Sequence, residues 1–505
     1  MAYVRTVKTA SGAVAVQIVW SSRRGARTIE HLGSGHDDGE VEALKAAARQ
    51  RLTQGQATLD LNVETAGSGA GPLEILTSRA SVLWDSLCRG YELLGLGNAV
   101  SGDTVFRDLV LARIIEPSSK QDAARVLSEA GISAASYATV KRRLPRYATT
   151  ELRQALSAAC AAHARLGPAS LVLYDVSTLY FETDTGDGFR EPVFSKERRL
   201  EPQITIGLLT DADGFPLAVQ AFEGNKAETT TMLPVIKEFM TAHRLTDVTV
   251  VADAGMISEA NQIAITKAGL TYILGARIPF LPSVIAEWRT KHPDDEIPDQ
   301  QIFTQPWPAT DREKTRGIPD RVTYYQYRAD RARRTLRGID EQVAKAQAAV
   351  DGKAPVKRNR FITLTGATKS VNTTLVAKTK QLAGWKGYTT NLTSVDASFV
   401  IGAYHQLWHV EKSFRMSKSD LQARPIYHHK RESIDAHLAI VFAALAVSHW
   451  IETTTGWSIK RFVQTARRYR TITIRAGQQT LTAADPLPDD LRDAISKIND
   501  HDGAH

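Results

Sequence analysis

The stretch Leu171-Val-Leu-Tyr-Asp175-Val-Ser-Thr-Leu-Tyr-Phe181 is where the chain changes from helical to strand-like patterning. Apolar residues dominate this stretch and Asp175 is its only charged residue. A short apolar run of this kind is typical of a buried strand. A buried, unpaired carboxylate is costly, so a strand that keeps one usually gives it a cation. Asp175 is therefore a candidate site residue, with capping of a bend as its alternative role.

Further strands follow along the chain and alternate with helices. Helical periodicity covers Thr229–His243 and Ser258–Ala268. Strand patterns cover five more segments: Gln203–Thr210, Pro216–Phe222, Val248–Asp253, Thr271–Gly275 and Gly387–Leu392. Three strands followed by alternating helices and strands predict a mixed sheet with helices on its faces.

A second carboxylate, Asp253, ends the apolar run Val248-Thr-Val-Val-Ala-Asp253. Taken alone, Asp253 has an alternative role in opening the Asp-Ala-Gly turn that follows. Together with Asp175 it is more informative, because neighbouring parallel strands end at the same edge of a sheet. The two carboxylates are therefore expected to lie close together.

A third carboxylate lies in Tyr404-His-Gln-Leu-Trp-His-Val-Glu411-Lys-Ser-Phe-Arg415-Met-Ser-Lys418. On a continuous α-helix, residues seven apart differ by only about 20° in direction, so Tyr404, Glu411 and Lys418 are expected to share one face. Arg415 lies one turn beyond Glu411 on that face, although it could equally form an ordinary helix ion pair with Glu411. Three carboxylates can hold two Mg²⁺ ions about 3.5 to 4 Å apart, which is a site for phosphodiester chemistry.

Two regions precede the first strand of this sheet. Residues 1–75 predict a small α+β module, with strands within 2–34 and a helix at 40–52, and a Gly/Ser-rich linker at Ala66–Pro72. Residues 76–168 are helical and contain a possible helix-turn-helix for DNA binding, whose second helix carries Lys141, Arg142 and Arg143. An ordinary helical bundle with a solvated basic end is the alternative.

The remaining boundaries follow from where the sheet pattern stops and resumes. We expect residues 169–279 to form the first part of the core around the predicted sheet and 386–455 its second part. Between them, residues 280–385 predict a strand-rich insertion, with strands at 321–328 and 360–364 and a basic helix at about 331–349. Residues 456–505 form a basic C-terminal region and tail.

Basic charge is concentrated in two segments of the chain. The net charge is +8, yet residues 401–475 carry twelve Lys/Arg against five Asp/Glu, and residues 311–360 carry fourteen against seven. Two such clusters flanking the candidate helix favour a polyanionic partner such as DNA over simply solvated faces.

Other features exclude several classes of protein. Cys88 and Cys160 are the only cysteines and both fall in apolar helical patterns, which excludes a disulfide framework or a thiolate metal site. The N-terminus lacks the apolar core of a signal peptide. The longest apolar run, Ala436–Trp450, is shorter than the roughly 20 residues that span a bilayer and predicts a buried core helix. We expect a cytoplasmic protein that does not bind membranes.

Four motifs taken together resemble a known family. They are Tyr174-Asp175-Val-Ser-Thr, the Ile204–Asn225 block ending in Phe222-Glu-Gly-Asn, Val250-Val-Ala-Asp253-Ala-Gly and the Tyr404–Lys418 helix. Their order and spacing are similar to those of DDE transposases of bacterial insertion sequences. The branch suggested has a strand-rich insertion before the final glutamate and a Tyr-Arg-Glu-Lys signature around it. Arg113-Ile-Ile-Glu-Pro-Ser-Ser-Lys120 is also like members of this group.

The resemblance implies an RNase H-like catalytic core and roles for individual residues. Asp175, Asp253 and Glu411 match the metal-binding catalytic acids, and Tyr404 and Lys418 match signature residues that contact phosphate near the cut. The signature arginine should fall at Leu407, so one phosphate contact is in doubt.

Neighbouring residues are candidates for further contacts with DNA. Arg415 is a candidate for the cation that Leu407 does not supply. Trp385 and Trp408 are candidates for stacking on an unpaired base, with packing as the alternative role of each.

The activity implied is cleavage at the terminal inverted repeats of an insertion sequence and joining of the 3′-hydroxyls to target DNA. The cofactor implied is Mg²⁺ or Mn²⁺, with two ions, and the partner is double-stranded DNA at the element ends and the target. Pairing two ends implies a homodimer in the DNA-bound complex. The alternatives are a domesticated or inactive DNA-binding descendant and another RNase H-fold metal-dependent nuclease.

Overall fold

The computed structural model describes residues 2–8, 13–21, 27–35, 37–53, 73–167, 170–182, 186–192, 201–227, 230–245, 248–256, 258–353, 355, 359–365, 368–428 and 430–500. The predicted linker Ala66–Pro72 lies outside these ranges. The chain divides into two compact units, Met1–Pro72 and Leu73–His505. The finer division predicted from the sequence remains a prediction.

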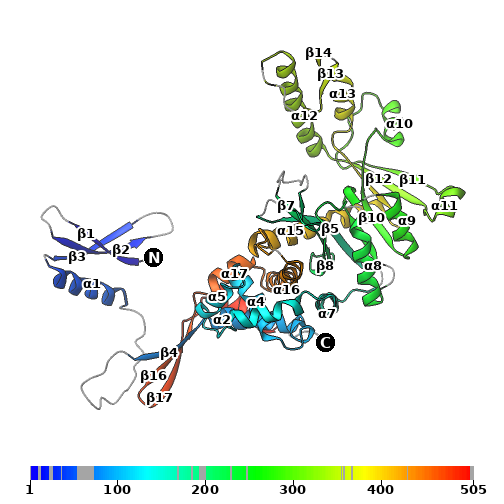
Figure 1. The fold of residues 1–505 in the computed structure, drawn as a ribbon. Helices are drawn as coiled ribbons and strands as arrows, with labels where there is room; N and C mark the ends of the chain where they lie inside the picture. Colours follow the sequence, from blue (N-terminus) through cyan, green and yellow to red (C-terminus); the bar gives the residue numbers. More distant parts are fainter. Residues whose placement is uncertain are drawn as a thin grey trace. The chain divides into compact units, whose positions relative to one another are not determined.

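The first unit is a small α+β module (Figure 1). Its antiparallel sheet has the order β1 (Ala2–Lys8), β2 (Val14–Ser21) and β3 (Arg27–Gly35). Helix α1 (Asp38–Thr53) contacts all three strands, and apolar side chains from β2 and α1 form the core between them. The alternating pattern of β2 places every second side chain on the face that α1 covers.

The second unit begins with a strand and six helices. β4 (Glu74–Arg79) precedes the helices, which are α2 (Ser81–Leu93), α3 (Leu96–Ala99), α4 (Thr104–Ile115), α5 (Ala123–Glu129), α6 (Tyr137–Tyr147) and α7 (Thr150–Ala164). Side chains of Asp103, Ser136 and Thr149 accept hydrogen bonds from backbone N–H groups at the starts of α4, α6 and α7. In the turn before α5, the Ser119 hydroxyl oxygen accepts a hydrogen bond from the backbone N–H of Asp122.

A nine-stranded mixed sheet forms the centre of the second unit. Its order is β11-β12-β15-β10-β9-β5-β7-β6, with β8 paired to β7. The strands are β5 (Leu171–Tyr180), β6 (Glu191–Pro192), β7 (Pro202–Thr210), β8 (Pro216–Phe222), β9 (Thr249–Ala252), β10 (Thr271–Ala276), β11 (Ile302–Trp307), β12 (Arg321–Tyr327) and β15 (Trp385–Thr390). β5, β9 and β10 are parallel neighbours, whereas β7, β8, β12 and β15 pair antiparallel. The predicted mixed α/β fold with a large mixed sheet is confirmed.

Helices connect and cover these strands. α8 (Met232–His243) joins β8 to β9, and the short 3-10 turn η2 (Ala254–Met256) and α9 (Glu259–Lys267) join β9 to β10. α8 contacts β7 and β8, and α9 contacts β10. β7 is buried along its whole length, which explains its nearly continuous apolar sequence.

The segment predicted as an insertion leaves the sheet after β10 and returns at β15. Its strands β11 and β12 extend the central sheet, so this part of the segment is continuous with the core sheet. The remaining elements are α10 (Ser283–Lys291), α11 (Asp311–Arg316), α12 (Ala329–Val350), β13 (Ile362–Thr365), β14 (Thr368–Val371) and α13 (Thr373–Gln381). α12, β14 and α13 pack around a small core that contains Ile339 and Phe361.

After β15, the second unit is mainly helical and contains two further strands among its described residues. α14 (Ala397–His405), α15 (Leu407–Arg415) and the π-helical segment η3 (Met416–Asp420) are followed by α16 (Arg431–Thr455), α17 (Ile459–Ala466), β16 (Thr471–Ala476), β17 (Gln479–Ala484) and α18 (Asp489–Asp500). β16 pairs with β17 on one side and with β4 on the other. The C-terminal strands therefore join the strand that precedes α2.

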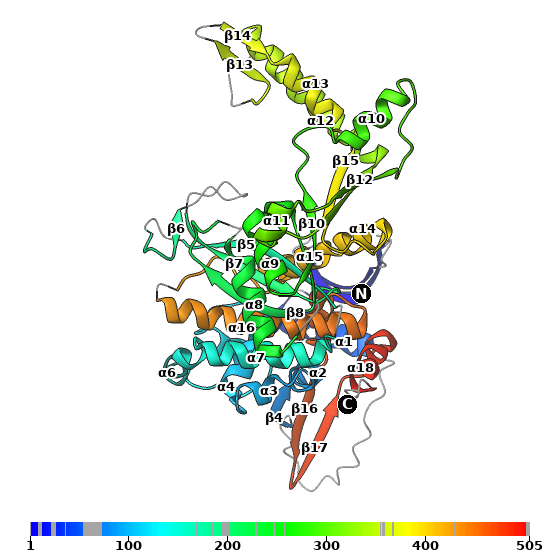
Figure 2. The same ribbon diagram turned by 90° about the vertical axis from the view of Figure 1, so that its right-hand side faces the viewer.

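α16 is the central core helix of the second unit. It contacts α2, α4, α6 and α18 as well as β8, and Figure 2 shows it running across the molecule between the sheet and the cyan helices. Among the described residues it is the one helix long and apolar enough to cross a membrane, but 94% of its most apolar window is buried inside the protein. The predicted burial of Ala436–Trp450 is confirmed.

Candidate active site

Asp175 and Asp253 lie next to each other in register at one edge of the central sheet. β5 and β9 are parallel, and Tyr174 of β5 pairs with Ala252 of β9. Asp175 is the next residue of β5, which continues to Tyr180, and Asp253 is the residue after the end of β9. The two acids lie close together, as predicted, although β5 does not end beside β9. Asp175 is half-buried and Asp253 is exposed, where β9 gives way to η2.

A lysine comes to the same edge from the opposite direction. β15 runs antiparallel to β10, with Gly387 paired to Ala276 at the carboxyl end of β10. The first residues of β15 therefore lie at the edge where the parallel strands end. Lys386, which precedes Gly387, is brought beside the two acids in this way.

The helices after β15 complete the site. α14 contacts β9, β10 and β15, while α15 contacts β5 and β7. Tyr404 lies near the end of α14 and Glu411 on α15. Together with the sheet edge they enclose a cavity of about 420 Å³, lined by Tyr174, Asp175, Asp253, Lys386, Tyr404, His405, Leu407, Trp408, Val410 and Glu411. We call this the acid cavity.

Tyr404 links the helix to the sheet edge. Its hydroxyl donates a hydrogen bond of 2.6 Å to Oδ1 of Asp253. Its ring packs edge-on against Tyr388, with 5.0 Å between the ring centroids. Burial, and next the bond to Asp253, hold the pKa of Tyr404 far above its usual range, so the hydroxyl stays a donor at neutral pH.

The basic groups of the acid cavity are Lys386 and His405. Lys386 Nζ lies 4.4 Å from the centre of the Tyr404 ring, a cation–π contact. Burial lowers the pKa of Lys386, and the charges of Asp253 and Glu411 oppose that shift. Burial and then the positive charge of Lys386 lower the pKa of His405, which favours its neutral form at pH 7.

The predicted continuous helix from Tyr404 to Lys418 is wrong. α14 ends at His405, and Gln406 bonds in the tighter i,i+3 pattern, donating to Ala403 and accepting from His409. Beyond Arg415 the chain turns π-helical in η3. The seven-residue spacing places side chains on one face only while the helix is uninterrupted.

These interruptions of the helix affect Arg415 and Lys418, the two cations that were predicted to contact DNA. Tyr404 and Glu411 line the acid cavity, whereas Arg415 and Lys418 are not among the described residues that do. Arg415 is exposed on α15, and Lys418 is half-buried in η3. Leu407, at the position where an arginine was expected, is buried and apolar at the cavity wall.

The two candidate tryptophans have different environments. Trp385 is buried at the start of β15 in a cluster with Phe303 and Tyr327. Its alternative role, packing, is the one the structure supports. Trp408 is 53% exposed and lines the acid cavity, with its ring against His409. Of the two, Trp408 is the ring that a base could reach.

The acid cavity provides oxygen ligands. Carboxylates are the ligands that Mg²⁺ and Mn²⁺ prefer in proteins, and Asp175, Asp253 and Glu411 supply three. Within the described ranges, no three His, Cys, Asp or Glu side chains lie close enough together to form a metal site as they stand. Three like charges repel, and one oxygen of Asp253 is held by Tyr404. The donor chemistry fits divalent ions, but binding them requires these carboxylates to move closer together.

The basic residues of the predicted DNA-binding helix lie on α6. Lys141 and Arg142 are exposed, whereas Arg143 forms an ion pair with Asp103. Asp103 also caps α4, so this ion pair connects Arg143 to the start of that helix. Residues 130–136 separate α5 from α6, which is longer than the usual helix-turn-helix connection of about three or four residues.

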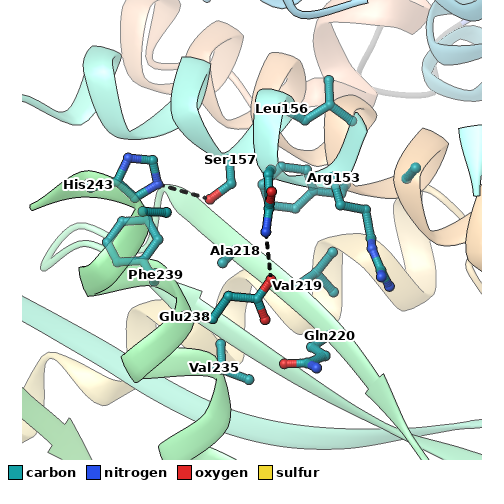
Figure 3. A pocket seen from close by; sticks show the side chains of 14 residues that line it. Arg153, Leu156, Ser157, Ala218, Val219, Gln220, Val235, Glu238, Phe239 and His243 are labelled. Carbon is teal, nitrogen blue, oxygen red and sulfur yellow. Dashed lines mark hydrogen bonds between the residues drawn. The ribbon is translucent and has the colours of Figure 1, made fainter. Parts of the chain in front are cut away.

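A second cavity lies between α7, β8 and α8 (Figure 3). Ser157 donates a hydrogen bond to the Leu217 carbonyl, and the Gln154 amide donates to Glu238 across it. Its volume of about 60 Å³ suits a few water molecules and excludes a nucleotide. None of the residues predicted for the site lines it.

Lys386 was missed by the reasoning from sequence. The predicted strand began at Gly387, two residues after the observed start of β15 at Trp385, so it did not include Lys386. The available signal was the same as for Asp175: a charged residue kept inside a strand whose neighbours are buried.

Two of three comparisons with known proteins gave matches. A family model described as "Transposase DDE domain" matches residues 167–447, a range that contains every residue lining the acid cavity. No curated protein matches the chain. A cryo-EM structure of the piggyBac transposase synaptic complex with hairpin DNA is similar, with 11% identity, a TM-score of 0.37, and coverage of 81% of this chain and 73% of that chain.

Proposed function

The chain belongs to the family of transposases with a DDE domain, and we propose that it moves a bacterial insertion sequence. In this proposal it binds the terminal inverted repeats of the element, cleaves DNA there and joins the 3′-hydroxyl ends to target DNA. The observation that carries the proposal is the acid cavity, where Asp175, Asp253 and Glu411 gather from two strands and a helix. Such an arrangement serves metal-dependent phosphodiester chemistry.

We propose Asp175, Asp253 and Glu411 as the ligands of two Mg²⁺ or Mn²⁺ ions. When bound, these ions supply polarisation of the attacking hydroxyl and stabilisation of the leaving oxygen. Tyr404 fixes the orientation of Asp253 through its hydrogen bond, because its ring is held by Tyr388. Trp408 offers an exposed ring on which a base near the cut can stack.

We assign the catalytic core to the RNase H-like folds and the chain to the Tyr-Arg-Glu-Lys branch. Support for the fold comes from the parallel strands β5, β9 and β10 beside antiparallel β7 and β8, with acids at the edge. Support for the branch comes from Tyr404 and Glu411 in one cavity. In this branch Lys418 contacts phosphate outside the cavity, and Leu407 replaces the arginine.

The other regions are proposed to hold DNA. Residues 1–75 and 76–168 recognise the terminal repeats, the latter with Lys141 and Arg142 of α6. The basic parts of 280–385 and of the segment after Trp457 hold the phosphate backbone, together with Arg415. Two copies of the chain pair the two element ends.

The experiment uses a plasmid that carries the gene with its natural flanking sequence on both sides. Purified protein is incubated with it in Mg²⁺, and new 3′-hydroxyl ends are mapped by end labelling. We expect ends at two inverted repeats that flank the gene, and no ends when EDTA replaces Mg²⁺. Binding without cleavage would favour the inactive DNA-binding descendant, and cleavage unrelated to inverted repeats would favour another nuclease.

A further inference from the structure

The side chains that line the acid cavity carry a net negative charge, which repels DNA. Three carboxylates line it, and Lys386 is the one lysine or arginine among the described residues that do so. His405 adds no charge when its imidazole is neutral. A DNA strand brings a further negative charge at each phosphate. Without metal ions, a phosphate that approaches the acids meets a net negative charge, and a cation within the cavity reduces that repulsion.

Lys386 is held where such a cation is needed. It extends from the sheet edge at which Asp175 and Asp253 lie, and its charge interacts with Asp253 and Glu411. The face of the Tyr404 ring lies 4.4 Å from Nζ and that of Tyr388 lies 5.9 Å away. Aromatic faces on its path limit the positions of the ammonium group without consuming its hydrogen bonds.

A second cation, Arg331, lies near Lys386. Arg331, in the first turn of α12, donates a hydrogen bond of 3.3 Å to the carbonyl of Gly384 just before β15. Its charge reaches Lys386, Tyr388 and His405. Two positively charged side chains, Lys386 and Arg331, therefore lie near the start of β15.

Other basic residues are less well placed than Lys386 to contact a phosphate in the acid cavity. Leu407 contributes an apolar side chain to the cavity wall, and Arg415 and Lys418 lie outside the described lining. Lys412 forms an ion pair of 2.8 Å with Glu452. We propose that Lys386 is a substrate-binding residue of the acid cavity and contacts the phosphate of the DNA strand at the cut. This inference rests on the proposed function and assigns one further residue to it.

The test compares Lys386→Met, Lys386→Arg and a control, Lys237→Met. Lys237 is an exposed lysine on α8 that does not line the acid cavity. Cleavage of the plasmid with the gene and its flanks is measured in single turnover. We expect Lys386→Met to slow cleavage by about 10- to 100-fold, as for loss of a charge-assisted hydrogen bond. Lys386→Arg should keep cleavage within about tenfold of the original, and Lys237→Met should leave it unchanged.

A second measurement does not depend on activity. Mn²⁺ binding is titrated by electron paramagnetic resonance in the absence of DNA, together with thermal unfolding of each variant. Removing a positive charge beside the carboxylates should raise the affinity of Lys386→Met for Mn²⁺ several-fold without lowering its unfolding temperature. Unchanged Mn²⁺ affinity would place Lys386 away from the acids and overturn the inference.

The two proposals fail in different ways. If Lys386→Met cleaves as fast as the original protein while that cleavage still requires metal, the inference about Lys386 is overturned and the proposed function stands. If the unmodified protein makes no metal-dependent ends at the flanking repeats, the proposed function falls and the inference falls with it.

Discussion

Tyr404 is the residue on which the geometry of the acid cavity depends most directly. Its hydroxyl bonds to Asp253, and its ring lies between Tyr388 and the ammonium group of Lys386. This single side chain therefore contacts an acid, an aromatic residue and a cation of the cavity. A hydrogen bond from a neutral donor limits the orientations that the Asp253 carboxylate can adopt.

Tyr404→Phe tests this positioning role. The change removes the hydroxyl and keeps the ring, so packing against Tyr388 is retained. A hydrogen bond to a charged group contributes about 1.5 to 3 kcal/mol. We expect metal-dependent cleavage to fall by about 10- to 100-fold at limiting Mg²⁺, with a smaller loss at saturating Mg²⁺. Equal loss at both Mg²⁺ concentrations would show that the hydroxyl does not act through a metal ligand.

Two tryptophans at neighbouring elements provide a matched pair of variants. Trp385→Ala removes a buried ring from the cluster of Phe303 and Tyr327, which should cost about 3 to 5 kcal/mol of unfolding free energy. Trp408→Ala removes an exposed ring and should change stability by less than about 0.5 kcal/mol. If Trp408 stacks on a base, its loss should slow cleavage about tenfold. Denaturant unfolding and single-turnover cleavage of both variants check this contrast.

At the scale of elements, a buried basic cluster joins the α4–α5 connection to the segment after η3. Lys120 Nζ lies within hydrogen-bonding distance of His428 Nε2, and Arg113 contacts the carbonyls of Leu421 and Gln422. His437 packs against His428, and its Nε2–H donates a hydrogen bond to the carbonyl of Ala423. Burial, and next the charge of Arg113, lower the pKa of Lys120 to about 7.

This cluster predicts a dependence of stability on pH. The Lys120 pKa falls from 10.5 when unfolded to about 7 when folded, so between these values the unfolded chain binds more protons. Stability should therefore rise with pH across this window. Relative to Lys120→Met, which lacks this group, the original protein should gain a few kcal/mol between about pH 7 and pH 10. Parallel stability curves for the two proteins would contradict the assignment.

Some elements and their site residues could be predicted from local pattern, and others could not. β5 and β9 are short apolar runs, so local pattern identified the strands beside Asp175 and Asp253. The break at Gln406 could not be predicted, because no Pro or Gly marks it in the sequence. The bond from Tyr404 to Asp253 could not be predicted either, because it joins residues far apart in the chain. Propensity and periodicity report only on neighbours in sequence.

Pairings between distant segments were missed for the same reason. β4 pairs with β16, and Arg475 forms an ion pair with Glu74, which no local pattern indicates. Lys386 was missed because the predicted strand began two residues after the observed start of β15, a typical size of error for strand ends. The three carboxylates could be identified from the type of element alone, whereas Lys386 required the exact first residue of β15.

At the scale of the whole molecule, the basic charge of the chain should make DNA binding depend steeply on salt. Arg333 and Arg337 are exposed on α12, in a segment proposed to hold the phosphate backbone. Each phosphate contact lowers the slope of log affinity against log salt by about 0.9. Arg333→Gln with Arg337→Gln should therefore reduce the magnitude of the slope by about two, at every DNA sequence tested.

Filter binding across a range of salt concentrations measures this slope. Lys237→Met, on α8 outside the proposed DNA-binding regions, is the matched charge-removing control. A slope that is flat for the unmodified protein, or unaltered by the double substitution, would argue against α12 as part of the DNA surface.

The central claim is that Asp175, Asp253 and Glu411 together form a metal-dependent DNA-cleaving site. The most direct measurement is Mg²⁺-dependent production of 3′-hydroxyl ends by Asp175→Asn, Asp253→Asn and Glu411→Gln, beside Glu287→Gln, an exposed residue of α10 outside the cavity. We predict that each cavity variant loses cleavage by at least about 100-fold while binding the same DNA, because several kcal/mol of metal stabilisation are lost. Glu287→Gln should cleave normally. Full cleavage by any one cavity variant would contradict the claim and remove that residue from the site.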